Sequence, residues 1–290
     1  MDTVTERSPA KLNLSLDVLR RRSDGFHDLR MVMCSVEFGD DVTVGLRSDG
    51  ESVCESNLYW LPKDGRNLAL KAADVFFSTM GEKNPGVEIQ LHKRVPVGAG
   101  MAGGSANAAA VLRALNMLTG ARLGADELRR IGLEVGSDVP YGIAGGNALA
   151  AGRGERLMPL PPIPACSVVI CKPGFSISTA ELFHRIDSLS LRTHPDTAGI
   201  VEALEKNDLA GVARRMYNVF EDALPRSSGE IRSIRGELLD RGALGAVMTG
   251  TGSAVFGLFD DDEKARTALE SFRSRYRDCS LTKIRNDPLI

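Results

Sequence analysis

The sequence predicts an α+β fold in which antiparallel or mixed sheets are combined with several helices. In the N-terminal half, strand-like segments follow one another directly more often than they alternate with helices, which argues against a doubly wound parallel sheet. In the C-terminal half, two apolar segments flank a glycine-containing turn at 249–252, which is typical of paired strands. A proline cluster at 159–165 predicts a linker, and we place two domains at 1–158 and 159–290.

Hydrophobic periodicity predicts each element of the N-terminal half. Residues 10–19 alternate strictly, which predicts a strand with one buried face and with Lys11 and Asn13 on the opposite, polar face. Two further strands are expected at 31–38 and 41–46, on either side of a Gly39-Asp40 turn. Helices are predicted at 67–81, in the second part of the stretch that begins at Val95 and ends near Gly120, and at 125–136. Strands are predicted at 86–95 and 146–152.

The C-terminal half begins after the proline cluster. A short apolar run there predicts a buried strand, and amphipathic patterns predict several helices between about 178 and 241. That buried strand is expected at 167–173, and the other elements expected in this half are the two strands within 243–259, a helix at 262–275 and a strand at 279–285.

Composition excludes several classes of protein. The formal net charge of −2 gives no overall electrostatic footprint for nucleic acid. The N-terminal residues contain no apolar signal-peptide core, and no run of about 18 apolar residues predicts a membrane-spanning helix. The cysteines are odd in number and widely spaced, which predicts reduced thiols in a cytoplasmic protein. They are Cys34, Cys54, Cys166, Cys171 and Cys279.

The stretch VPVGAGMAGGSANAAAVLRALN (95–116) places four glycines directly before a strong helix former. One interpretation is a tight turn of small residues. The other is an anion cradle, because glycines let backbone amides approach a phosphate and a helix N-terminus favours negative charge. The stretch lacks the Gly-Lys-Ser/Thr of a Walker A loop, and its single G-x-G-x-x-G match is weak. The residues of this stretch alone leave the two interpretations evenly balanced.

Four other features carry possible chemistry, each beside a simpler interpretation. Lys11 lies on a polar strand face, where a lone lysine is usually solvated. Asp138 lies between a helix end and a proline, where it caps a turn or orients a substrate hydroxyl. His27 has no second histidine at metal spacing, so it acts as a base or a hydrogen-bonding reader of a substrate. Residues 249–253 form a flexible turn or a second backbone cradle.

Taken together and in order, these motifs resemble the GHMP kinase superfamily. The matching segments cover nearly the whole chain, and together they are far more specific than one glycine pattern. They are PAKLNLSLDVLRRRSDGFHDL (9–29), VPVGAGMAGGSANAA (95–109), GSDVPYGIAGGNALAAGRGE (136–155) and MTGTGSAVF (248–256). The resemblance implies a two-domain GHMP kinase fold with the active site in the interdomain cleft. The N-terminal domain would be of the ribosomal protein S5 domain 2-like type and the C-terminal domain related to ferredoxin-like folds.

The resemblance also implies an activity and its residues. The enzyme would use ATP and Mg²⁺ to phosphorylate the 2-hydroxyl of a CDP-linked methylerythritol in the non-mevalonate route to isoprenoid precursors. Lys11 and Asp138 would be catalytic and would pair with each other, and Ser105 would contact Mg²⁺. The implied nucleotide contacts are Asn67, Pro96, Val97, Gly98, Ala99, Gly100, Met101, Ala102, Gly103, Gly104, Ser105 and Ala106. The implied substrate contacts are Asn13, Phe26, His27, Thr179, Phe183, Gly250, Thr251, Gly252 and Ser253, with Phe26 and Phe183 enclosing the cytosine.

The chain departs from the family pattern at four positions. Phe26 replaces a usual tyrosine, and Met33 replaces a frequent aromatic residue of the cytidine wall. Ala102 and Ala106 replace a glycine and a serine of the phosphate loop. We expect Ala102 to adopt a negative φ, because alanine is strained at positive φ.

Two other functions are compatible with the motifs. One is a GHMP kinase for another small alcohol, such as homoserine or mevalonate, although RRRSDGFHDL (20–29) favours cytidine recognition. The other is a noncatalytic nucleotide-binding scaffold, which the presence of both Lys11 and Asp138 disfavours. The expected partner is a small molecule, with no nucleic acid and no membrane, and the expected assembly is a monomer or homodimer.

Overall fold

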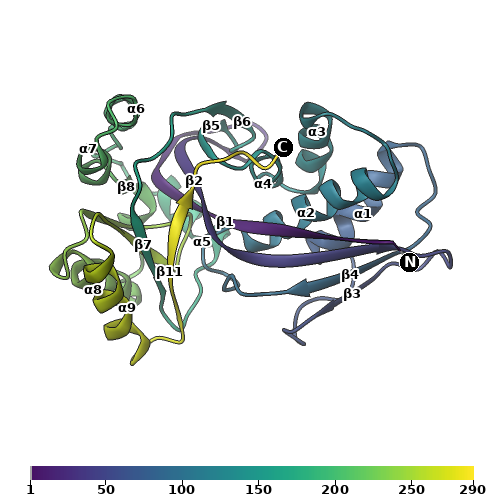
Figure 1. Cartoon of the computed structure of the whole chain (residues 1–290). Helices are drawn as coiled ribbons and strands as arrows, with labels where there is room; N and C mark the ends of the chain where they lie inside the picture. Colours follow the sequence, from purple (N-terminus) through teal and green to yellow (C-terminus); the bar gives the residue numbers. More distant parts are fainter. Residues whose placement is uncertain (1) are drawn as a thin grey trace.

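The structure is a computed structural model that describes residues 2–290; Met1, the first residue of the predicted N-terminal domain, lies outside the described residues. An eleven-stranded sheet runs through the molecule, and its main path has the order β3-β4-β2-β11-β7-β10-β9. Helices cover this sheet in both halves of the chain (Figure 1). The predicted α+β class is confirmed.

A long antiparallel pair, β1 (Thr3–Arg21) and β2 (His27–Leu46), forms the centre of the N-terminal half. The prediction of a turn at Gly39-Asp40 is wrong, because β2 continues through both residues and pairs there with Ser8 and Pro9. A Cβ atom on Gly39 would lie 2.3 Å from the Ser8 carbonyl oxygen. The glycine therefore permits close approach of two backbones and does not reverse the chain.

The simpler interpretation of the polar face of 10–19, a solvated lysine, does not hold. The side chains of Lys11 and Asn13 are both buried, with 6% and 0% of their surface exposed. The turn at 249–250 covers this polar face, since the Asn13 amide donates to Thr249 Oγ1 at 3.1 Å. Irregularities in the β1–β2 register occur between Pro9 and Lys11 and again after Asn13. Such bulges re-aim side chains beside functional sites.

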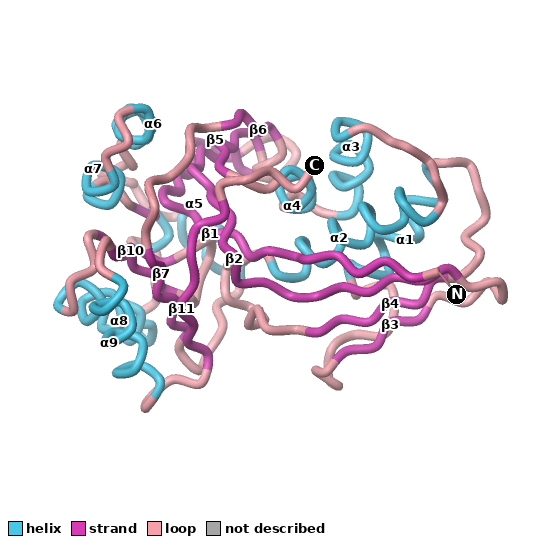
Figure 2. The backbone as a smooth tube through the Cα atoms, viewed as in Figure 1, coloured by secondary structure: helices cyan, strands magenta, loops and turns pink. Residues whose placement is uncertain are grey.

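The helices of the N-terminal half pack on one face of β1, β2 and β4 (Figure 2). Apolar side chains of these strands and helices share one core, as the amphipathic patterns predict. The two short strands β3 and β6 were not predicted, because each has only four residues. The elements are β3 (Val53–Ser56), α1 (Leu68–Thr79), β4 (Val87–His92), α2 (Gly103–Leu118), α3 (Ala125–Val135), α4 (Val139–Ala144), β5 (Asn147–Gly152) and β6 (Arg156–Pro159).

The C-terminal half is a second layered unit (Figure 1). Helices α8 and α9 share a core with one face of its strands, while α6 and α7 share a core with the other face. Its elements are β7 (Ser167–Lys172), α5 (Thr179–Asp187), α6 (Thr197–Glu205), α7 (Leu209–Arg214), β8 (Tyr217–Asn218), α8 (Gly229–Asp240), β9 (Gly245–Met248), β10 (Val255–Phe259), α9 (Asp262–Arg273) and β11 (Asp278–Arg285), with 3-10 turns at Val219–Glu221 and Arg226–Ser228.

The last strand joins the two halves. β11 pairs with β7 along most of its length and with β2 through Ile284 and Arg285. The sheet therefore continues across the predicted boundary at 158/159, and that division stays a prediction. The five cysteines are free thiols. No helix within residues 2–290 is long and apolar enough to cross a membrane.

Candidate active site

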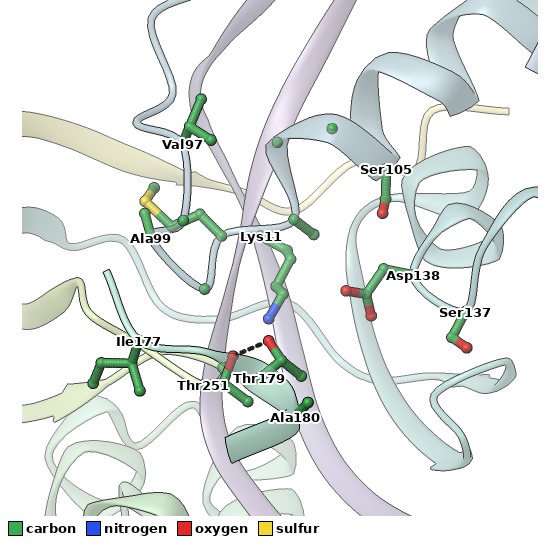
Figure 3. Close-up of a pocket in the computed structure, with 18 of the residues that line it drawn as sticks. Lys11, Val97, Ala99, Ser105, Ser137, Asp138, Ile177, Thr179, Ala180 and Thr251 are labelled. Carbon is green, nitrogen blue, oxygen red and sulfur yellow. Dashed lines mark hydrogen bonds between the residues drawn. The ribbon is translucent and has the colours of Figure 1, made fainter. Parts of the chain in front are cut away.

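One cavity of about 990 Å³ lies where the two halves meet. Its walls are the glycine-rich loop before α2, the middle and end of β1, the N-terminus of α4, α5 and the turn between β9 and β10. Figure 3 shows part of it, with the Lys11 side chain directed toward Thr179 and Thr251 and with Ser105 and Asp138 to the right of Lys11. The structure thus brings together residues that lie far apart in the sequence.

The glycine-rich loop is held by its carbonyl oxygens. The Ala99 oxygen accepts from the Ala254 amide at 3.2 Å, and the Met101 oxygen accepts from the Lys11 amide at 3.2 Å. Gly100 has φ +75°, and a Cβ atom there would lie 2.1 Å from the Thr249 oxygen. Since the loop carbonyls bond to the protein and the first amides of α2 have no helical partner, this region can offer donors to an anion.

Ala102 differs from the expected conformation. It is the N-cap of α2 and has φ 55° and ψ 28°, in the left-handed region. The expectation of a negative φ is therefore wrong, because the loop geometry that precedes α2 imposes the conformation a glycine would adopt freely. A non-glycine residue in this region costs about 1–2 kcal/mol.

A buried polar cluster fixes the base of the loop. The Asp40 carboxylate accepts from the Lys93 ammonium and from the amides of Arg94 and Val95, the latter at 2.6 and 2.8 Å. Asn107 of α2 bonds to both charged groups, accepting from Lys93 and donating to Asp40, each at 2.9 Å. The end of β4 and the start of α2 are thereby tied to β2, and Lys93 reaches the cavity wall.

Lys11 and Asp138 both line the cavity. Burial lowers the pKa of the Lys11 ammonium below its usual 10.5, while the Asp138 charge opposes that shift. Asp138 precedes α4, and its side chain makes no capping bond. The predicted pairing is not found: within residues 2–290 no ion pair joins the two side chains, and Lys11 Nζ instead donates to Asn13 Oδ1 at 2.5 Å.

The β9–β10 turn closes the cavity from the C-terminal half. Gly250, Thr251 and Gly252 line it, and Thr251 Oγ1 lies 2.9 Å from Thr179 Oγ1 at the start of α5. Ser253 is buried, and its hydroxyl donates to the Phe175 carbonyl oxygen at 2.5 Å. Ser253 and Asn13 lie behind the cavity wall, so their predicted substrate contacts stay predictions.

Aromatic and charged side chains form the end of the cavity near α5. His27 stacks on Phe183 with ring centroids 4.6 Å apart, and its Nε2 lies 2.6 Å from Asp187 Oδ1. This hydrogen bond with His27 lowers the pKa of the Asp187 carboxyl. Phe26 is 49% exposed, with the Arg153 guanidinium 4.7 Å from its ring centroid. Met33 packs in the buried core behind this end.

The opposite end of the cavity is bounded by Asn67. Its side chain caps α1 by accepting from the Ala69 amide at 3.0 Å and donates to the Pro62 carbonyl oxygen at 2.9 Å. The other predicted loop residues from Pro96 to Ser105 also line the cavity, whereas Ala106 is buried in α2.

Several cavity residues were not predicted. Arg153 follows β5 in the segment GRGE, whose glycines signalled a turn but not a cavity wall. Asp187 comes from α5, and no local pattern distinguishes it from a surface charge; Arg21, at the end of β1, lies within the RRRSDGFHDL segment but was not singled out there. Their role in the cavity depends on which elements pack together.

Comparison with known proteins gives consistent matches along the chain. Residues 67–155 match the family model of the GHMP kinases N terminal domain, and residues 200–278 match that of the GHMP kinases C terminal. A 4-diphosphocytidyl-2-C-methyl-D-erythritol kinase from Alkaliphilus metalliredigens is 39% identical over 98% of this chain and 97% of its own. A kinase of the same name from Clostridium novyi is 40% identical over 96% and 98%.

Solved structures show the same architecture. A crystal structure of 4-(cytidine 5'-diphospho)-2C-methyl-D-erythritol kinase has a TM-score of 0.80 and 31% identity, covering 97% of this chain and 99% of its own. A homoserine kinase from Cytophaga hutchinsonii has a TM-score of 0.76 at 21% identity, covering 99% and 96%. At that identity, the second likeness shows the fold alone.

Proposed function

The chain belongs to the GHMP kinase family, and we propose that it transfers the γ-phosphoryl group of ATP to the 2-hydroxyl of 4-diphosphocytidyl-2-C-methyl-D-erythritol. The observation that carries this proposal is one continuous cavity with a glycine-rich anion cradle and a separate aromatic end that contains His27 and Phe183. Phosphoryl transfer between two nucleotide-like substrates needs such a shared space.

ATP would lie along the glycine-rich loop. The amides of Gly103 and Gly104 begin α2, where the helix dipole favours phosphate oxygens. Asn67, Leu61 and Pro62 border the cavity beyond the loop, in position to contact the base and ribose. This orientation would direct the γ-phosphate toward Lys11 and Asp138.

In the proposed reaction, the substrate 2-hydroxyl oxygen attacks the γ-phosphorus and the bond to the ADP oxygen breaks. Asp138 would orient the hydroxyl and accept its proton, because its carboxylate has no capping bond and faces the cavity. The Lys11 ammonium would stabilise the negative charge on the transferred group.

Mg²⁺ fits this donor set. Among the described residues no three His, Cys, Asp or Glu side chains gather into a metal site. Mg²⁺ usually binds through substrate phosphates and one or two protein oxygens, and Ser105 offers a hydroxyl at the cavity wall. Bound there, the ion would neutralise phosphate charge.

The cytidine group would occupy the aromatic end. Phe183 offers a stacking surface whose ring is supported by Phe220 at 4.9 Å. His27, oriented by Asp187, can hydrogen-bond to the edge of a base, and the Arg153 guanidinium can balance phosphate charge. Homoserine and mevalonate have neither a base nor a diphosphate to use these groups.

ADP release in a coupled assay tests the proposal. We expect turnover with the CDP-linked substrate and ATP·Mg²⁺, and far lower kcat/KM with homoserine or mevalonate. Thermal shifts with CDP, CMP and ATP·Mg²⁺ provide a binding control. Turnover of another alcohol in preference to the CDP-linked one would contradict the substrate, and nucleotide binding without turnover of any alcohol would favour a scaffold.

The proposal places the enzyme in the cytoplasm, where ATP is available, as a monomer or homodimer. It includes no nucleic-acid or membrane partner. Light scattering after size-exclusion chromatography distinguishes the two assembly states, because their masses differ twofold.

A further inference from the structure

Asn13 lies two residues after Lys11 on β1 but does not itself line the cavity. Its side chain is fully buried and lies behind the cavity wall. Its Oδ1 atom accepts from Lys11 Nζ at 2.5 Å, from the Gly250 amide at 3.0 Å and from Thr249 Oγ1 at 3.3 Å. One oxygen therefore connects the Lys11 ammonium to the turn of the C-terminal half.

The side-chain nitrogen of Asn13, Nδ2, has only a weak hydrogen-bond acceptor. It donates to the sulfur of Met31 at 3.4 Å, and a thioether is a poor acceptor. All three contacts of Oδ1 are with groups that can donate, although the Thr249 hydroxyl is shared with the Gly100 carbonyl oxygen at 3.3 Å. The carboxylate of an aspartate would satisfy these contacts equally well. What asparagine provides instead is the absence of charge.

We propose that Asn13 is a positioning residue, whose side-chain oxygen holds the Lys11 ammonium at the junction of the two halves without neutralising its charge. This inference rests on the proposed function, since it assigns Lys11 to the phosphoryl group. A carboxylate at the same place would form a buried ion pair and reduce the positive field at the transferred group. A neutral oxygen orients the ammonium and leaves its charge available to ATP.

The other charges around Lys11 support this division of roles. Asp138 of the α4 N-terminus favours the ammonium from across the cavity, and Cys34 of β2 is the other titratable neighbour. Burial raises the pKa of the Cys34 thiol, which therefore stays neutral at physiological pH. Among residues 2–290, Asp138 is thus the one carboxylate that acts on the protonation of Lys11, and a second one at position 13 would change that balance.

The same oxygen also secures the turn, so the test needs a control for that effect. Asn218 is a matched control because it is also fully buried and donates to the oxygens of Met248 and Gly250 at 2.7 and 2.8 Å. Asn218→Ala loosens the turn without removing a contact of Lys11.

The first measurement is the pH dependence of kcat and KM. In Asn13→Ala we expect kcat to fall about 10²-fold, since small displacements of a positioned group have effects of that size, with an alkaline limb moved to lower pH. In Asn13→Asp we expect a lower kcat and an alkaline limb about one to three units higher, because a close opposite charge favours the ammonium. Shifts of both variants in the same direction, or the same shift in Asn218→Ala, would overturn the proposal.

The second measurement does not depend on turnover. Trace acetylation by acetic anhydride, followed by mass spectrometry across a pH series, reports the titration of Lys11 in each folded variant. We expect its midpoint to fall in Asn13→Ala, to rise in Asn13→Asp and to stay unchanged in Asn218→Ala. Identical midpoints in all four proteins would overturn the inference, whereas inactivity of the wild type toward the CDP-linked substrate would overturn only the proposed function.

Discussion

The two ends of the cavity are built differently. At the phosphate end, backbone carbonyls of Ala99 and Met101 bond to the C-terminal turn and to β1, and the buried Asp40–Lys93–Asn107 cluster anchors the loop. At the aromatic end, single side chains from β2 and α5 meet, and Phe26 is half exposed. Backbone hydrogen bonds therefore fix the geometry of the phosphate end, whereas individual side chains form the aromatic end. Substitutions should therefore affect kcat at one end and KM at the other.

The largest expected effect is that of Asp138→Asn. If Asp138 accepts the substrate proton, kcat should fall roughly 10²- to 10⁴-fold, while ATP binding is retained because the backbone cradle is untouched. Single-turnover kinetics and isothermal titration with a nonhydrolysable ATP analogue measure the two quantities. A variant with near-normal kcat would remove Asp138 from the proposed mechanism.

The next prediction concerns pH. Burial lowers the pKa of Lys11, and its charged form is the one that assists transfer. The contribution of Lys11 to activity should thus be complete below that pKa and be lost as the pH rises through it, at a midpoint below 10.5, the usual value for lysine. Lys11→Arg should lose this alkaline decline, because arginine stays protonated. A pH–rate profile of each protein checks this, and an alkaline limb that persists in Lys11→Arg would assign the decline to another group.

At the aromatic end, Phe183→Ala should weaken binding of the CDP-linked substrate by about 1–3 kcal/mol, the range for base–aromatic stacking. The KM for that substrate should rise while kcat and the KM for ATP change little. Phe183→Tyr retains the ring and serves as the control. Equal KM values in Phe183→Ala and the wild type would place the base elsewhere.

The smallest effect is expected at Ala102. Glycine adopts its left-handed conformation without strain, so Ala102→Gly should stabilise the protein by about 1 kcal/mol or less, because glycine also gains entropy in the unfolded chain. Urea unfolding monitored by circular dichroism measures the change. A lower midpoint in Ala102→Gly would show that the alanine methyl group contributes more than the strain costs.

Periodicity predicted most of the elements around the site. The alternation of 10–19 and the helix patterns around 103–118 and 125–135 depend on local side-chain order, which is why their positions agree with the structure. The prediction of a turn at Gly39-Asp40 was wrong because glycine is used both where the chain reverses and where two backbones approach closely. Only the position of β1 beside β2 shows which of the two applies. The alternation also left open whether the Lys11 face is solvated, because a strand pattern cannot show which later segment covers that face.

By itself the sequence determined the α+β class, the family motifs and the residue types of the phosphate cradle, since these depend on local order along the chain. Only the tertiary structure decided that Ala102 is left-handed, that Lys11 contacts Asn13 rather than Asp138, and that Arg153 and Asp187 reach the cavity. Most of these features depend on contacts between segments more than a hundred residues apart, such as His27 with Asp187. The Lys11–Asn13 contact joins neighbours on one strand, and a turn from the other half, at Thr249, covers it. Such contacts follow from the packing of the two halves, which no local pattern encodes.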